Sequence, residues 1–427
     1  MKRAPYVVMV SAFGYFVDVL DLFLFNAVRQ KSLIDLGINA ADSLNVGMRL
    51  LNIQMIGLLL GAFVFGCLGD RLGRSRALCG SILVYSAGTF LNGWVDSVFA
   101  YGLCRFISGF GLAGELGAAI TMVSETLPQK TRGLGTTLVA SFGLGGGVCA
   151  AVLAESVSWR TCYLVGGLAG FGLLFFRLSA SETALFRVSE RRPEPKGSLR
   201  LLFRNSLSAR RFVRPLFIGA PVWFVAGIVI AFSPELGAAL GTPSIVAARA
   251  VLVSYLGVAL GDVGCGLLSQ RLQSRRRAML LFLCVLPLVL WFLTTTRGPN
   301  PSAFYWLCFF LGVSTGYWAV LLTTAAEQFG TNLRATVATT TPNLVRAATI
   351  PLTLLFRWLQ PIFGTVATVQ ILGFGTVALA LLGLRALPET FHRSLDFFET
   401  GSHIDPTSPA SKFGPGSAKT GSRPCNL

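Results

Sequence analysis

Long apolar stretches, each about the length needed to cross a lipid bilayer, fill most of this chain of 427 residues. A membrane-spanning helix needs about 20 predominantly apolar residues. Hydrophobic residues make up 53% of the chain and charged residues only 13%, about half the charged share of a soluble domain. The pattern therefore predicts an all-α membrane protein with twelve transmembrane helices. We expect these spans near residues 5–28, 46–68, 77–95, 100–124, 134–155, 160–177, 213–233, 246–268, 278–296, 302–325, 336–359 and 362–386.

The formal net charge of +17 is distributed in a way that predicts topology. Basic residues are dense at the start of the chain and in every second connection, most of all between Arg177 and Arg214. Because Lys and Arg stay on the cytoplasmic side during insertion, we expect both termini and the 179–212 segment to be cytoplasmic, in the plasma (inner) membrane. The charge is thus a topology signal, and no nucleic-acid partner is expected.

The chain also repeats itself, because its second and eighth predicted spans align at a shift of 200 residues. The first copy has Gly57, Gly61, Gly66, Leu68, Arg71 and Leu72, and the second has Gly257, Gly261, Gly266, Leu268, Arg271 and Leu272. Two parallel six-helix repeats, with the binding site near the bilayer midplane between them, are a transporter architecture. We predict an N-terminal six-helix bundle over 1–178, a cytoplasmic linker over 179–212, a C-terminal six-helix bundle over 213–390, and a cytoplasmic, largely disordered tail over 391–427.

One motif connects the second and third predicted spans. It reads Gly66-Cys-Leu-Gly-Asp70-Arg71-Leu-Gly73-Arg74-Ser-Arg76. The motif resembles the loop signature G-x-x-x-D-R-x-G-R-R of the major facilitator superfamily. The resemblance implies a conformational latch that stabilises one access state and is formed by Gly66, Asp70, Arg71, Gly73 and Arg74. In the second repeat Gln270 replaces the acid and Gln273 the glycine, so we expect the latch to be asymmetric.

Two further segments resemble the metabolite:proton symporter branch of that superfamily. The first-span segment Gly14-Tyr-Phe-Val-Asp18-Val-Leu-Asp21 is similar to the pattern G-N-x-x-E-W-x-D, with Asp18 in place of Glu. The fourth-span segment from Arg105 to Glu115 is similar to R-x-x-x-G followed by G-G-E. The Pro-Glu-Thr sequence at 388–390 resembles the ending common to sugar and metabolite members. The resemblance implies a proton-coupled symporter of a small metabolite.

Ionisable side chains inside the predicted spans are the candidate functional groups, since charge in hydrocarbon is costly. Asp18 and Asp21 share a helical face, and two close carboxylates cannot both ionise easily, so one could carry a proton. The alternative is that they only bind arginines that hold the bundle together. Arg105 and Glu115 are about 15 Å apart along their span, so each must pair with another helix. We predict that Asp18, Asp21, Arg105 and Glu115 serve proton coupling, with Asp18 or Asp21 as the partner of Arg105.

Arg346 lies halfway along the eleventh predicted span. Its guanidinium is always charged and forks onto carboxylates or phosphates, which favours an anionic or zwitterionic substrate. The alternative is a structural ion pair, for which Glu327 is one possible partner. Asp262, in the eighth span, is equally compatible with a gate pair and a ligand contact. The predicted substrate-binding residues are Arg346, Asp21, Asn343, Tyr317 and Trp318.

Together these features predict a secondary active transporter, a proton-coupled symporter of a small organic carboxylate or zwitterion working by alternating access. A uniporter or exporter of the same fold, with purely structural acids, is the alternative, and a non-transporting membrane sensor is a third. The sequence has no nucleophile–base constellation, metal-ligand cluster or phosphate-binding loop, so we expect no enzyme activity, metal or cofactor. We expect a monomer whose partners are the bilayer, protons and the solute.

Overall fold

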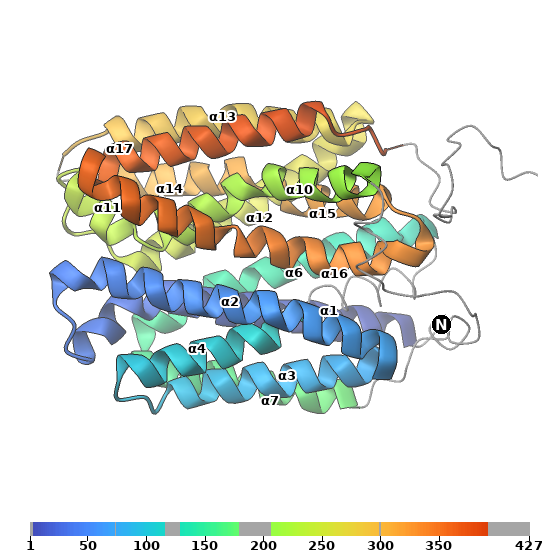
Figure 1. Cartoon of the computed structure of the whole chain (residues 1–427), viewed down its shortest axis with the longest axis horizontal. Helices are drawn as coiled ribbons and strands as arrows, with labels where there is room; N and C mark the ends of the chain where they lie inside the picture. The colour runs from blue at the N-terminus through green and yellow to red at the C-terminus, as the bar shows by residue number, and fades with distance from the viewer. Residues whose placement is uncertain (1–2, 73, 116–128, 179–205, 299, 392–427) are drawn as a thin grey trace, which may run out of the picture.

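The computed structural model describes residues 3–72, 74–115, 129–178, 206–298 and 300–391, and these are almost entirely helical. The helices lie side by side and form two stacked bundles (Figure 1). The first bundle contains α1 (Arg3–Asp35), α2 (Ala40–Leu72), α3 (Arg74–Asn92), α4 (Val98–Leu112), α6 (Gln129–Ser156) and α7 (Trp159–Leu178). The second contains α10 (Ser206–Phe224), η1 (Val225–Ile230), α11 (Ser233–Ala239), α12 (Ala247–Leu272), α13 (Arg275–Thr295), α14 (Pro301–Thr315), α15 (Trp318–Glu327), α16 (Thr331–Ala347) and α17 (Thr349–Arg385).

These elements make the predicted twelve spans in two groups of six. In the second bundle one span combines α10 with the π-helix η1, and another combines α14 with α15. The eleventh span consists of α16 and the first part of α17. The remainder of α17 is the twelfth, because the backbone leaves helical geometry at Gly364, with φ 78° and ψ 168°. The predicted fold class is therefore confirmed, while these interruptions were not predicted.

Two helices extend beyond their predicted ends. α1 runs to Asp35, so Arg29, which the sequence pattern placed in a connection, lies inside a helix. α10 begins at Ser206, inside the predicted 179–212 linker. The rest of that linker and the tail from residue 392 onward lie outside the described residues. We call the end of the molecule where α1 begins and α17 finishes the near end, and the opposite end, where α1 finishes, the far end (Figure 1).

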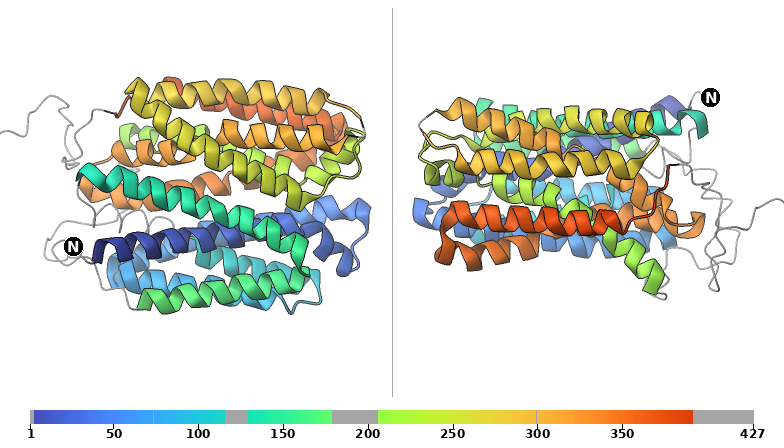
Figure 2. Two further views of the ribbon diagram at one scale, coloured as in Figure 1. Left: turned by 180° about the vertical axis from the view of Figure 1, so that it is seen from behind. Right: turned by 90° about the horizontal axis from the view of Figure 1, so that it is seen from above.

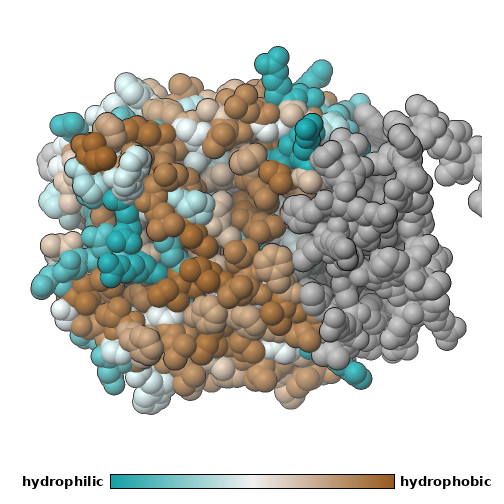
Figure 3. Space-filling view, in the orientation of Figure 1, coloured by the Kyte–Doolittle hydropathy of each residue, from teal (hydrophilic) through white to brown (hydrophobic). Residues whose placement is uncertain are grey.

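Large apolar side chains cover the outside of both bundles. Figure 3 shows one such face, largely hydrophobic across its middle and more hydrophilic at the far end. Single exposed hydrophobic residues are common on soluble proteins, but a continuous apolar exterior indicates contact with lipid. Among the described residues at least half exposed are Phe99, Phe175, Leu267, Leu288, Trp306, Trp358 and Leu382.

The repeat seen in the sequence recurs in the packing of each bundle. In the first, Gly57 and Gly61 of α2 face backbone carbonyls of α4 so closely that a Cβ atom would clash with them. In the second, Gly257 and Gly261 of α12 face carbonyls of α14 in the same way. Small residues let transmembrane helices approach at backbone distance, so both halves use the same crossing.

The two halves meet along helices from each bundle. α6 and α1 pack against α12 (Figure 2), and α2 packs against α16 and α17 (Figure 1). A site between the halves must therefore be built from these helices.

Candidate functional site between the two halves

A buried ion pair joins the halves. Arg346 of α16 donates to Oδ2 of Asp18 on α1 over 2.9 Å. Asp18 is fully buried and Arg346 is 1% exposed, so each charge depends on the other for compensation. Glu327, the partner named for a structural ion pair of Arg346, is bound instead to Arg275. Arg346 thus pairs with one of the two first-span acids.

A cavity of about 40 Å³ lies between the halves beside this pair. Arg346 contributes a charged side chain to its wall, and α1 and the second bundle contribute aromatic rings. The aromatic residues that line the cavity are Tyr15, Phe23, Trp223, Tyr255 and Trp318. A cavity this size accommodates only a few water molecules, so the site is contracted in this conformation.

The aromatic rings pack against one another and against the arginine. The Trp223 ring centroid lies 5.8 Å from the guanidinium carbon of Arg346, within cation–π range. Trp318 meets Trp223 edge to face at 6.4 Å, and Tyr255 lies 4.2 Å from Phe23. The wall is thus one cation surrounded by flat apolar surfaces.

Asp21 lies on α1 one turn from Asp18 but belongs to a different network. It accepts a hydrogen bond of 2.5 Å from Thr89, and Arg105 lies 4.0 Å away. Arg105 also donates to the side-chain oxygen of Gln54 and lies over the ring of Phe25 at 5.1 Å. These residues belong to the first bundle, so this network stays within one half.

Glu115 pairs with Arg177 of α7 at 2.7 Å, and both side chains are buried. The pair lies beside Gly14 of α1, where a Cβ atom would overlap the carboxylate and the guanidinium. Arg105 and Glu115 therefore have different partners, as their separation along the chain requires. The charge pattern groups Arg177 with the basic linker, but its place at the end of a span also favours a buried partner.

Two other predicted substrate contacts do not line the cavity. Asn343 donates to the backbone oxygens of Ala113 and Thr339, at 2.8 and 3.0 Å, so it joins the two halves. The Tyr317 hydroxyl donates to the oxygen of Ile218 at 2.9 Å and is fully buried. Of the five predicted contacts, Arg346 and Trp318 line the cavity, and Asp21 lies in the neighbouring network.

The sequence reasoning missed two groups. Tyr15 lines the cavity, and its place three residues before Asp18 on the same helical face could have indicated this. Arg29 is fully buried at the far end, where it donates to Glu235 at 2.7 Å and lies 4.4 Å over the ring of Phe232. The sequence placed Arg29 in a connection, but α1 extends to Asp35, so Arg29 lies inside a helix and pairs with Glu235 of the other half.

A family model described as the Major Facilitator Superfamily matches residues 11–349. The chain belongs to this superfamily. It is similar to the niacin transporter NiaP of Acinetobacter baylyi, with 27% identity over 76% of this chain and 80% of that one. It is also similar to the sialic acid transporter NanX of Escherichia coli, with 25% identity over 64% and 68%. The xylose transporter XylE from E. coli, partially occluded and inward open, has the same fold, with TM-score 0.72 and 15% identity over 92% of this chain and 100% of that one.

The protein is thus a multi-pass membrane transporter of small metabolites and not an enzyme. The motif predicted to form a latch spans the junction of α2 and α3, where α2 ends at Leu72 and α3 begins at Arg74. Gly73 and the side chains of the other latch residues lie outside the described residues. In the second repeat, Gln273 takes Gly73's place and adopts a left-handed conformation with φ 47°. That conformation favours glycine, so the second copy tolerates strain at this turn.

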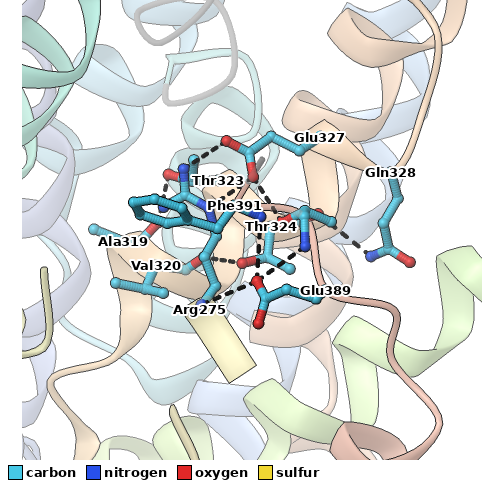
Figure 4. A network of polar contacts seen from close by, with 10 residues as sticks. Arg275, Ala319, Val320, Thr323, Thr324, Glu327, Gln328, Glu389 and Phe391 are labelled. Atoms are coloured by element: carbon cyan, nitrogen blue, oxygen red, sulfur yellow. Dashed lines mark hydrogen bonds and ion pairs between the residues drawn. The ribbon is translucent and has the colours of Figure 1, made fainter. Parts of the chain in front are cut away.

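At the near end, the second bundle contains a polar network (Figure 4). Arg275 forks onto Glu327 with bonds of 2.7 and 2.6 Å, and Thr390 donates to the same carboxylate at 2.8 Å. Glu389 accepts from the Ser274 hydroxyl and from the backbone N–H of Arg275 at the start of α13. Burial alone would raise the pKa of Glu389, but these hydrogen bonds hold it below its usual value. The Pro-Glu-Thr segment therefore fastens the end of α17 to α13.

Proposed function

We propose that this transporter is a proton-coupled symporter of small organic carboxylates that works by alternating access. The observation that supports this is the Asp18–Arg346 pair, which joins the two halves beside the cavity between them. Asp18 is the acid that can take up the proton, and Arg346 is the cation that can bind the substrate carboxylate.

Coupling follows from the charges at this site. When a proton binds Asp18, the ion pair is lost and Arg346 is left as an uncompensated buried cation. A substrate carboxylate then replaces Asp18 on the guanidinium, with the bidentate geometry that arginine favours. The site is neutral when empty and deprotonated, and neutral again with one proton and one monoanion.

The two incomplete states carry net charge. A proton without substrate leaves +1 at Arg346, and substrate without a proton leaves −1 at the site. A buried uncompensated charge costs several kcal/mol, so neither state changes its access readily. The halves therefore rock only when the site holds both ligands or neither, which gives symport of one proton with each monoanion.

The cavity wall favours a flat acid over a flexible one. Its aromatic rings offer stacking surfaces next to a single cation, and a zwitterion would need an additional anionic contact for its amine. Asp21, which could supply one, is engaged by Thr89 and Arg105. Niacin and sialic acid, named for two relatives, are both carboxylic acids. We therefore place aromatic monocarboxylates first among the substrates to be tested.

The far end of the site is the closed side. Beyond the central pair, Arg29–Glu235 and Arg249–Glu155 join the halves there, at 2.7 and 2.9 Å. We assign the near end to the cytoplasm, because the basic residues gather there. On this assignment we expect the predicted latch residues Asp70 and Arg71 to stabilise the opposite access state from the cytoplasmic face. On this assignment the far-end ion pairs close the site toward the outside.

Reconstitution of the purified protein into liposomes tests this function. Labelled nicotinate and benzoate are compared with nicotinamide, a neutral analogue, and with a zwitterionic amino acid, at equal pH and with an acidic exterior. We expect the carboxylates to accumulate above equilibrium only when the exterior is acidic, with a matching fall in internal pH. Carboxylate uptake at the same rate and extent without the gradient would support the uniporter or exporter instead.

A further inference from the structure

The tenth span is interrupted beside the cavity. α14 ends at Thr315, the backbone at Gly316 leaves helical geometry with φ −75° and ψ 47°, and α15 begins at Trp318. A Cβ atom at Gly316 would clash with the backbone of α12 at Gly261 and Asp262, so the break is pressed against that helix. The break therefore has a defined position.

Asp262 caps the helix that starts at this break. Its Oδ1 accepts the backbone N–H of Ala319, in the first turn of α15, at 2.9 Å. The residue at the N-cap position, Tyr317, makes no side-chain capping bond of its own. An acceptor oxygen at this position satisfies an otherwise unpaired backbone donor at the start of the helix. Asp262 is 5% exposed and does this from a neighbouring helix.

The capped helix carries a cavity residue at its first position. Trp318 lines the cavity, packs edge to face on Trp223 and interacts with the side chain of Tyr15 on the other half. Tyr15 lies one turn before Asp18 on α1. The orientation of the first turn of α15 thus sets where the Trp318 indole meets the other half.

We propose that Asp262 is a positioning residue for substrate binding: by capping α15 it fixes the Trp318 indole in the wall of the substrate cavity. This rests on the proposed function only in taking that cavity as the substrate site. It assigns Asp262 a role distinct from both a gate pair and a direct ligand. The role requires an acceptor oxygen at this position and not a negative charge.

The first test needs no substrate. Asp262→Asn retains an acceptor oxygen, whereas Asp262→Ala removes it. In each background the emission of Trp318 is obtained as the difference between the protein and its Trp318→Phe counterpart. We expect the Asn variant to match the parent and the Ala variant to show a shifted, more quencher-accessible emission. Identical Trp318 emission in parent and Ala variant would overturn the proposal.

The second test uses nicotinate or benzoate, whichever the liposome screen shows to be carried. We expect the Ala variant to raise KM about tenfold at nearly unchanged maximal rate, the effect of one lost capping hydrogen bond, and the Asn variant to stay near the parent. If Asn raises KM as much as Ala, the negative charge matters and the capping role is wrong. If Asn abolishes the response to the pH gradient, Asp262 carries a proton and positioning is again wrong.

Two controls separate these outcomes from misfolding and from failure of the proposed function. Val251→Ala alters a buried residue of the same helix about 16 Å along its axis from Asp262 and should leave emission and KM unchanged. If the Ala variant does not insert, Asp262→Leu, which also lacks an acceptor, takes its place. The emission test stands even if neither acid is transported, so the two proposals can fail independently.

Discussion

Two acids on α1 lie three residues apart, but one pairs with the other half of the protein and the other pairs within its own half. Asp18 points to the other half and binds Arg346, whereas Asp21 points into its own half and meets Thr89 and Arg105. Neutralising Asp18 breaks a bond between the halves, and neutralising Asp21 loosens one half internally. Only Asp18 has its partner across the interface between the halves, so we propose that Asp18, and not Asp21, couples proton binding to the change of access.

Substitution of Arg346, the partner of Asp18, should have the largest effect on transport. Arg346→Gln leaves Asp18 without a counter-charge and removes the substrate's binding group, so uptake should fall about a hundredfold or more. Arg346→Lys retains the charge but loses the bidentate fork, and should cost about tenfold. Liposome uptake normalised to inserted protein measures both. The matched control is Asp18→Asn combined with Arg346→Gln, which should restore stability but not uptake; restored uptake would make the pair purely structural.

Asp21 should give a smaller effect of a different kind. Asp21→Asn weakens the contact with Arg105 but leaves Asp18 and Arg346 in place, so we expect the initial rate to fall about threefold to tenfold with the response to the pH gradient retained. Thr89→Val, which removes the hydrogen bond to Asp21, is the matched variant and should act in the same direction. If Asp21→Asn abolishes gradient-driven accumulation, Asp21 and not Asp18 is the coupling acid.

Glu115 should affect stability more than coupling. Its pair with Arg177 lies within the first half, and removing one member of a buried pair costs about 3 kcal/mol or more of unfolding free energy. Glu115→Gln should therefore lower the unfolding temperature in detergent, while the remaining folded protein still accumulates substrate with the gradient. Loss of the gradient response at unchanged stability would place Glu115 in the proton path.

The exposed far-end pair, Arg249–Glu155, should give the smallest effect. Arg249 and Glu155 are 61% and 38% exposed, and exposed ion pairs contribute about 0–1 kcal/mol. Arg249→Gln should leave transport nearly unchanged, whereas Arg29→Gln, at a fully buried arginine, should favour the outward-open state. Labelling of a cysteine introduced at Tyr15 from outside the liposome measures the difference. Equal accessibility in the two variants would mean that Arg29 does not help to close the far end.

The fold could be predicted because the length of each apolar span and the internal repeat can both be read directly from the sequence. The twelve spans and the Gly57/Gly257 correspondence needed only the thickness of the bilayer and an internal alignment. The interruptions at Gly316 and Gly364 could not be predicted, because a glycine inside an apolar run is compatible with continuous helix. Only contact with α12 shows why the chain breaks at Gly316.

The site could be predicted only in part. The cost of burying charge identified Asp18, Asp21, Arg105, Glu115 and Arg346 as candidates. Their partners depend on which side of a helix faces which neighbour. The sequence left Arg105 with two possible acids, and it named Glu327, not Asp18, as a partner of Arg346. Tyr317 and Trp318 are adjacent, yet only Trp318 lines the cavity, because a helix begins between them.

The central claim is that a substrate carboxylate replaces the Asp18 carboxylate on Arg346. Transport by Asp18→Asn in liposomes tests it most directly. In this variant Arg346 has no protein counter-ion, so the carrier changes its access readily only when a substrate carboxylate is bound. We expect counterflow exchange of a transported carboxylate to continue, independent of pH, while net accumulation driven by an acidic exterior is lost. Accumulation equal to that of the parent, still dependent on pH, would contradict the account.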